Sequence, residues 1–255
     1  MKKIIMSRIF IVVITAIICI SGTVFAATKF QANEIGYKGT TVDKALDDLY
    51  GKANSRIIVC ALLDGTSKQV GAKYDCDPGD GIHRTFYVLK VNSNDIDLIM
   101  DRNITDTILV NNSKLLDWNS AIHFFDEGNP GYSITGAWDN VISISLPSIQ
   151  DIADAGGITN FNYETDSNCA FFGASNLNDA SKKTNYIWLY DYSRACSNHG
   201  CTNSLPDIDG YPFGYWTLDS VANNSNNAWI VGRGGRTDIL NKSEESLGVR
   251  PVIKV

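Results

Sequence analysis

The sequence predicts an α+β fold dominated by antiparallel strands, loop-rich, with one or two short helices. Its 28 acidic residues comprise 23 Asp and only 5 Glu, and Asn adds another 23. Asp and Asn side chains compete with helical hydrogen bonds and favour turns, whereas Glu favours helix. Short apolar segments also alternate with polar turns. The 44% of hydrophobic residues and 10% of aromatic residues exclude wholesale disorder.

The first 26 residues have the composition of an export signal. Lys2, Lys3 and Arg8 accompany an apolar run over 9–25, and Val24-Phe25-Ala26 offers small residues to a signal peptidase. We expect cleavage after Ala26. The alternative is an uncleaved anchor through 9–25, since about 17 apolar residues are the lower limit for a spanning helix. Either way, we expect the remaining chain to be secreted or to lie on the extracytoplasmic face of the cell membrane.

The net charge of the exported chain limits the classes of partner that it can bind. Without residues 1–26, 19 basic groups stand against 28 acidic groups, a net charge of −9. So acidic a chain, with no cluster of Lys or Arg, is a poor candidate for binding nucleic acid or anionic lipid. Weak cation binding and neutral sugars remain compatible with it.

The cysteines also fit an oxidising compartment. Cys196 and Cys201 flank a four-residue loop and are expected to pair, and Cys60 and Cys76 are candidates for a bridge from a strand to the loop after it. Cys169 is then left free, or pairs with another chain.

A metal site is the alternative for the later cysteines. It would use Cys169, Cys196, His199 and Cys201, but their spacing is loose, so the disulfide is favoured.

The sequence divides into three parts: 1–26, a linker over 27–55, and a domain over 56–255. Within the linker, Thr41 can cap a helix over 42–50 whose apolar residues share one face. Nine residues make too short a helix to be stable alone. It is either a solvated linker helix or a segment that packs against a partner.

The domain begins with a strand over 56–63 and a turn-rich stretch over 65–81. In that stretch Asp75, Asp77 and Asp80 resemble a calcium loop, but their spacing departs from the helix–loop–helix calcium motif. An acidic surface turn is the favoured interpretation.

Two later elements have clear local signals. Strands over 85–91 and 96–100 flank a four-residue polar turn, which predicts a hairpin. Ser148 begins a helix, with Asp151 placed as in a capping box and Gly156-Gly157 at its end.

The C-terminal third reads as a short helical segment over 186–192 followed by strands over 215–217, 227–231 and 248–253. Pro251 lacks an amide donor, so the last strand either lies at a sheet edge or starts after Pro251.

This pattern resembles the C-type-lectin-like fold in its bacterial, formylglycine-generating-enzyme-type branch. The resemblance covers about 84–255 and is carried by Tyr215-Trp216-Thr217, Ala228-Trp229-Ile230-Val231 and the closing Gly248-Val249-Arg250-Pro251. Leu146-Pro147-Ser148 is similar to the start of that branch's helix. The resemblance implies a mixed domain whose C-terminal strands support long, ligand-facing loops.

It also implies roles for particular residues. Arg250 would be structural, bridging strands or carboxylates, and Trp216 and Trp229 would be core aromatics, with sugar stacking as their alternative role. The loops over 207–213 and 219–227 would face the ligand through Tyr211, Phe213, Asp219, Asn223, Asn224, Asn226 and Asn227.

Departures from the family argue against an enzyme. The reactive late cysteine pair of the oxidases is missing, since Cys201 is the last cysteine. The Glu-Pro-Asn and Trp-Asn-Asp motifs of calcium-dependent lectins do not occur, so no cofactor is expected and calcium has no supporting motif. His83, His123 and His199 lie in none of the common catalytic motifs.

The sequence therefore predicts a non-enzymatic, exported or surface-attached ligand-binding or adhesion module, with a cell-surface glycan or protein as ligand. A variant is a receptor diversified by a retroelement, which varies adenine-rich codons such as those of Asn. The main alternative is a structural subunit of a surface fibre or pilus-like assembly. A degenerate relative of an oxidase or hydrolase ranks below both.

Overall fold

The computed structural model describes residues 36–37, 40–41, 60–106, 115–174, 183–194, 196–206, 210–232 and 234–255. The chain divides into two compact units, Met1–Gly51 and Lys52–Val255. In the first, β1 (Gly36–Tyr37) pairs antiparallel with β2 (Thr40–Thr41).

The export signal and the helix expected over 42–50 lie outside the described residues. Among the helices that the structure describes, none is long and apolar enough to cross a bilayer.

The second unit contains a six-stranded antiparallel sheet in the order β3-β4-β5-β6-β12-β7. Its strands are β3 (Cys60–Asp64), β4 (Lys73–Cys76), β5 (Arg84–Val91), β6 (Ile96–Met100), β7 (Ser143–Ser145) and β12 (Val252–Lys254). The expected hairpin is confirmed as β5 and β6. The sheet joins the first strands of the unit to the last.

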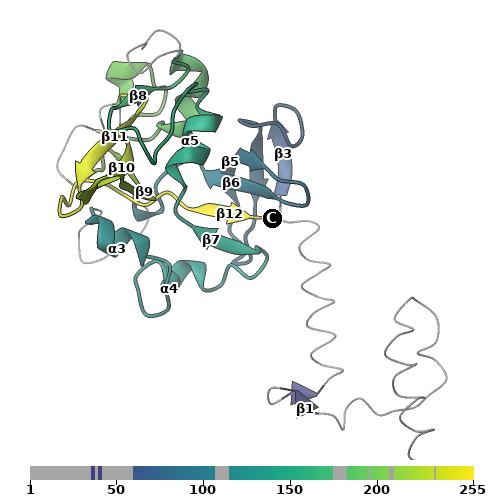
Figure 1. Cartoon of the computed structure of the whole chain (residues 1–255). Coiled ribbons are helices and arrows are strands. Elements are labelled where there is room, and N and C mark those ends of the chain that lie inside the picture. The colour runs from purple at the N-terminus through teal and green to yellow at the C-terminus, as the bar shows by residue number, and fades with distance from the viewer. Residues whose placement is uncertain are drawn as a thin grey trace, which may run out of the picture. The chain divides into compact units, whose positions relative to one another are not determined.

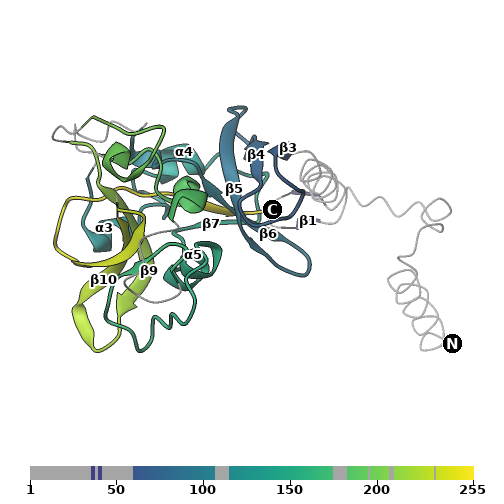
Figure 2. The ribbon, with the colours of Figure 1, turned by 90° about the horizontal axis from the view of Figure 1, so that it is seen from above.

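A second antiparallel sheet has the order β8-β11-β10-β9. Its strands are β8 (Ala170–Phe171), β9 (Gly214–Val221), β10 (Asn224–Gly232) and β11 (Arg236–Asn241). Figures 1 and 2 show the two sheets at opposite ends of the unit, with the helix α5 (Ile149–Ala155) between them. Short helices and antiparallel sheets together confirm the α+β class.

The other helices among the described residues are short. They are the α-helices α3 (Trp118–Ile122) and α4 (Tyr132–Thr135) and the 3-10 helices η3 (Ile104–Asp106), η4 (Lys183–Leu189) and η5 (Cys196–His199). Helix α5 begins where the sequence predicts, because the Ser148 side chain accepts hydrogen bonds from the backbone N–H groups of Gln150 and Asp151. The Asp151 carboxylate does not complete a capping box but accepts from Lys90 Nζ at 2.7 Å.

The second sheet lies between two apolar clusters. Trp216 and Ile230 belong to one cluster, and Tyr215 and Trp229 to the other. Adjacent residues of a strand point to opposite faces, so β9 and β10 contribute a large side chain to each side. Trp216 and Trp229 are fully buried, so neither ring offers an open face to a sugar.

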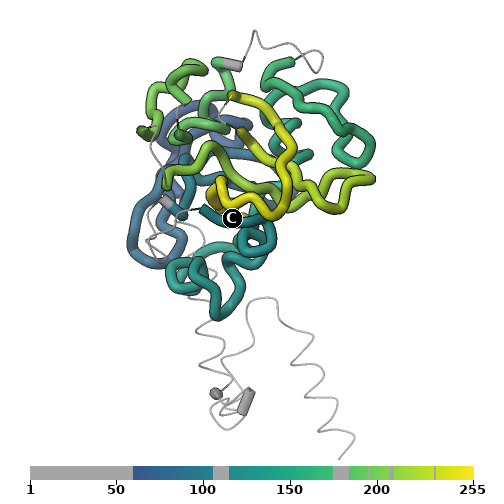
Figure 3. Tube along the Cα trace, turned by 90° about the vertical axis from the view of Figure 1, so that its left-hand side faces the viewer, coloured from purple at the N-terminus to yellow at the C-terminus, as the bar shows by residue number. Residues whose placement is uncertain are grey.

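Two expectations about strands need correction. Strand β4 lies inside the stretch expected to be turns, so Cys76 is in a strand and not in a loop. Of the two alternatives for the last strand, the structure confirms the second: β12 starts after Pro251, and it lies between β6 and β7. Figure 3 follows this C-terminal segment, in yellow, through the middle of the unit.

The second correction concerns the predicted ligand loop over 219–227. Asn224, Asn226 and Asn227 belong to β10, which pairs with β9 as a hairpin. Only two residues lie between the strands, and one of them, Asn223, has a φ of 58°. Asn tolerates that left-handed conformation better than most residues, so it suits a tight turn.

Candidate functional site

One face of the second sheet is open over β11. Ile230 and Gly232 of β10 lie opposite Asp238 and Arg236 of β11, and Arg236 lies opposite Phe171 of β8. Directly opposed residues of paired strands point to the same face. These side chains therefore form one surface, although β8 is far from β11 in sequence.

This surface is the floor of a hollow of about 600 Å³, which we call the β11 hollow. It is lined by Phe171, His199, Phe213, Ile230, Gly232, Gly234, Arg236, Asp238, Leu240, Ser246 and Leu247. Its volume lies within the usual range for ligand pockets, and most of its large side chains are apolar or aromatic.

An ion pair crosses the floor of the hollow. Arg236 Nη2 lies 2.6 Å from Asp238 Oδ2, and the guanidinium carbon lies 5.7 Å from the centroid of the Phe171 ring. The other carboxylate oxygen, Asp238 Oδ1, accepts from the Ile239 N–H at 2.9 Å and from the Cys169 thiol at 2.7 Å. These contacts hold Asp238 in place, whereas 40% of the Arg236 side chain remains exposed.

Cys169 remains a thiol in this arrangement. It is the free cysteine among the described residues. Burial, followed by the hydrogen bond to Asp238, raises the pKa of the Cys169 thiol to about 11. The thiolate is the reactive form of cysteine, so this group is poorly suited to act as a nucleophile.

Of the predicted ligand residues, Phe213 lines the β11 hollow. The guanidinium of Arg194 lies 4.3 Å from the centroid of its ring, and the Arg194 N–H donates to the Pro212 carbonyl at 2.8 Å. Tyr211 is described and half-buried but does not line the hollow. Residues 207–209 of the same predicted loop lie outside the described residues.

The other predicted ligand residues lie elsewhere. Asp219 is a helix cap, because its Oδ2 accepts from the Ile149 N–H at the start of α5 at 2.6 Å. Asn224 is six residues along β10 from Ile230, or about 20 Å at strand rise. The exposed Asn-rich end of the hairpin and the β11 hollow are therefore separate surfaces.

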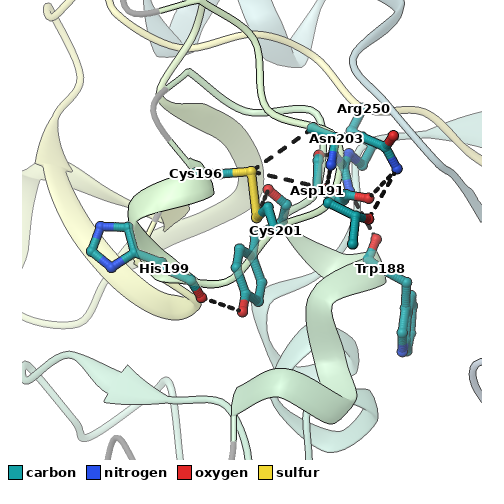
Figure 4. Close-up of a disulfide and its surroundings, with 9 residues drawn as sticks. Trp188, Asp191, Cys196, His199, Cys201, Asn203 and Arg250 are labelled. Atoms are coloured by element: carbon teal, nitrogen blue, oxygen red, sulfur yellow. Dashed lines mark hydrogen bonds between the residues drawn. A yellow bond between two sulfur atoms is a disulfide. The ribbon is translucent and has the colours of Figure 1, made fainter.

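Arg250, which was predicted to be structural, is fully buried, and Figure 4 shows its surroundings. Arg250 donates from Nη2 to the Asp191 carbonyl at 2.6 Å and from Nη1 to the Trp188 carbonyl at 3.1 Å. Its guanidinium also lies 4.6 Å from the centroid of the Tyr215 ring. Arg250 thus bridges backbone carbonyls, and not the carboxylates that were one alternative.

The disulfide Cys196–Cys201 lies beside these contacts, and Cys60–Cys76 links the paired strands β3 and β4. The Asp191 carboxylate accepts from the backbone N–H of Asn203 at 3.1 Å and from its Nδ2 at 2.9 Å. The carboxylate therefore holds the chain just after the disulfide loop.

These contacts bear on the alternative of a metal site. Cys196, Cys201 and Asp191 have ligand atoms within 4.8 Å of one another. In the disulfide, however, neither sulfur is a thiolate, which is the form that binds metal. Cys169, the third cysteine of that alternative, instead donates to Asp238, and His199 lines the β11 hollow.

The acidic turn over 75–80 is used by the fold itself. Asp77 Oδ1 accepts from the N–H groups of Gly79 and Gly81 at 2.9 and 3.0 Å. Asp80 forms two 2.8 Å hydrogen bonds with Arg84 and accepts from Trp138 Nε1 at 2.9 Å. Burial would raise the pKa of Asp80, but the hydrogen bonds from Arg84 and Trp138 outweigh it and lower the pKa.

No family model, curated protein or solved structure matches the chain. The residues of the β11 hollow therefore carry the functional assignment. Sequence reasoning missed Phe171, Arg236 and Asp238. The alternation of Arg236, Asp238 and Leu240 along one strand was a signal that could have identified this face of β11. No pattern in the sequence indicated that β8 contributes Phe171 to the same face.

Proposed function

We propose that this chain is an exported, non-enzymatic ligand-binding module with a C-type-lectin-like domain, and that it binds a cell-surface protein through the β11 hollow. One observation carries the proposal: the lining of the β11 hollow combines two phenyl rings with an ion pair. Two disulfides support export, because such bonds persist in oxidising compartments.

The chemistry of the hollow favours a protein ligand. Phe171, Phe213 and Leu240 supply apolar surface that can receive an apolar side chain of a partner. Protein interfaces concentrate binding energy in such pockets, with polar groups at the rim. Arg236 and Asp238 offer a donor and an acceptor side by side, which suits a partner's backbone amide and carbonyl.

The lectin-like resemblance implies ligand-facing loops that the C-terminal strands support. The β11 hollow lies on the sheet of those strands, and Phe213 of the predicted loop over 207–213 lines it. The proposed ligand surface differs from the predicted one, which consisted of the loops over 207–213 and 219–227. Side chains of strands β8, β10 and β11 form its floor, and Phe213 lies beside them. The fibre-subunit alternative depends on the segment over 42–50, on which the described residues do not bear.

Binding of the purified, labelled chain to target cells tests this function. We expect saturable binding that falls after the cells' surface proteins are digested with protease. Arg236→Ala should weaken binding by roughly 10-fold, the effect of one charge-assisted hydrogen bond.

Gly232→Ala provides a second probe of the hollow. A Cβ at Gly232 would meet only Asp238 atoms, at 3.9 Å, so the methyl group fits the fold while it occupies part of the hollow. Asn224→Ala is the matched control on the hairpin end. Binding that survives protease treatment and both hollow variants, yet is lost in Asn224→Ala, would contradict the assignment.

A further inference from the structure

A second, smaller hollow is lined by residues of the turn between β3 and β4 and of η4. It has a volume of about 270 Å³ and shares no lining residue with the β11 hollow. We call it the Trp188 hollow. It is lined by Gly65, Thr66, Gln69, Val70, Gly71, Ala72, Ala155, Asn185, Tyr186 and Trp188.

The first wall is the turn between β3 and β4, and its backbone is well fixed. Gly71 N–H donates to the Val88 carbonyl, and Val88 N–H donates back to the Ala72 carbonyl, both at 2.9 Å. Gly71 has a φ of +83°, and a Cβ there would lie 3.3 Å from Trp188 Nε1. The positive φ therefore favours glycine, and a side chain at this position would also crowd the indole.

The second wall is η4, which carries Tyr186 and Trp188. The indole of Trp188 stacks on the Tyr87 ring, with centroids 5.5 Å apart and planes 27° apart. Its carbonyl accepts from Arg250, and Figure 4 shows its side chain pointing away from the disulfide cluster. The aromatic wall is thus held from both its backbone and one ring face.

The lining is aromatic and polar but carries no charge. Among the residues described there, no Asp, Glu, Lys or Arg lines the hollow. Gln69 and Asn185 supply amide groups, Thr66 supplies a hydroxyl, and the Trp188 indole supplies an N–H. Within the described parts of the chain, these four side-chain groups have no hydrogen-bond partner.

From this geometry we propose that the Trp188 hollow binds one neutral sugar unit of a glycan. Sugars present apolar C–H faces, which suit an aromatic wall, together with hydroxyl groups, which both donate and accept. An amide side chain can hydrogen-bond to a sugar hydroxyl either as donor or as acceptor, because it carries an NH₂ group and a carbonyl oxygen.

Other ligand classes fit this hollow less well. A phosphate or carboxylate would find no cation in the lining. A purely apolar ligand would bury the four polar groups without partners, which costs free energy for each of them. The volume of the hollow, just below the usual range for ligand pockets, limits the bound group to a single small ring.

Glycan binding by the purified full chain tests the proposal, with neutral oligosaccharides and their sialylated or sulfated counterparts as probes. We expect binding to neutral glycans. Gln69→Ala and Asn185→Ala should each weaken it by roughly 10-fold, the effect of one lost hydrogen bond. Trp188→Phe keeps an aromatic ring and removes the indole N–H, so it should weaken binding similarly.

Two controls separate this site from the β11 hollow and from misfolding. Asn198→Ala removes an exposed amide that lines neither hollow, and Arg236→Ala alters only the β11 hollow; both should bind neutral glycans as the wild type does. The proposal is overturned if no neutral glycan binds, or if binding persists in a folded Gln69→Ala/Asn185→Ala variant. It is also overturned if Arg236→Ala alone abolishes glycan binding, because the sugar would then occupy the β11 hollow.

Discussion

Arg250 and Trp188 are joined by a 3.1 Å hydrogen bond from a guanidinium nitrogen to a backbone carbonyl across 62 residues of sequence. The same guanidinium binds the Asp191 carbonyl, so one side chain from the last segment of the chain fixes the backbone that follows η4. This stretch of backbone, from Trp188 in η4 to Asp191, carries the Trp188 ring at its start and leads into the disulfide loop at its end.

Arg250→Met should therefore destabilise the domain by about 3 kcal/mol, because two charge-assisted hydrogen bonds are lost. Arg250→Lys should recover part of that loss, since a lysine reaches at most one carbonyl in the same geometry. Urea unfolding of the three proteins measures both values. An Arg250→Met variant as stable as the wild type would show that the carbonyl contacts contribute nothing.

Asp219 stabilises the start of α5, and so Asp219→Ala should cost about 1 kcal/mol in the free energy of unfolding. Asp219→Asn keeps an oxygen acceptor for the Ile149 N–H and should cost less. Burial raises the pKa of Asp219 above its ordinary value of 3.8. The wild type should thus lose stability relative to Asp219→Asn as the pH rises through that raised pKa.

Measurement of the urea midpoint of both proteins between pH 3 and pH 7 follows that difference directly. If the difference instead grew in favour of the wild type with rising pH, the carboxylate would be stabilised in the fold and not desolvated.

Asp80 should show the opposite pH dependence. The pKa of Asp80 is lowered below 3.8 in the folded protein. Its contribution to the free energy of unfolding is therefore present above pH 3.8 and disappears as the pH falls through the lowered pKa. Asp80→Asn should cost about 2 kcal/mol at pH 7, because two hydrogen bonds from Arg84 lose their charged acceptor. The cost should vanish in strong acid. A deficit that is independent of pH would rule out this account of Asp80.

Cys169 should react slowly with iodoacetamide at pH 8, because a thiol whose pKa is about 11 holds little thiolate there. Asp238→Asn removes a negative charge next to the sulfur and should speed the reaction. Unfolding in urea under non-reducing conditions should speed it further, and mass spectrometry counts the added groups. Equal rates in the folded wild type and in urea would contradict the protected environment of this thiol.

Local signals in the sequence located the elements that depend on neighbouring residues. The hairpin of β5 and β6 and the cap of α5 by Ser148 follow from turn and capping chemistry over a few positions. Both disulfides were expected from spacing and compartment. Strand β4 was missed because Lys73 and Asp75 mask the alternation of Tyr74 with Cys76, whose side chains are buried.

The candidate site could not be predicted in the same way. Arg236 and Phe171 lie side by side only because β8 pairs with β11, although the two strands are far apart in the sequence. The Asn-rich segment indicated a loop, but strand pairing outweighs the weak intrinsic preference of Asn. Asn224 pairs with Val221 of β9 and Asn227 with Asn241 of β11, so both belong to β10. Phe213 was found because it lies close in sequence to the recognised strand β9.

Hydroxyl-radical footprinting of the chain, free and bound to its target cells, tests the central claim most directly, since it reports which side chains the ligand covers. We predict that Phe171 and Phe213 are protected on binding, while the residues of the hairpin end, 223–226, keep their reactivity. Protection confined to that hairpin end, with Phe171 and Phe213 unchanged, would contradict the assignment of the β11 hollow as the ligand site.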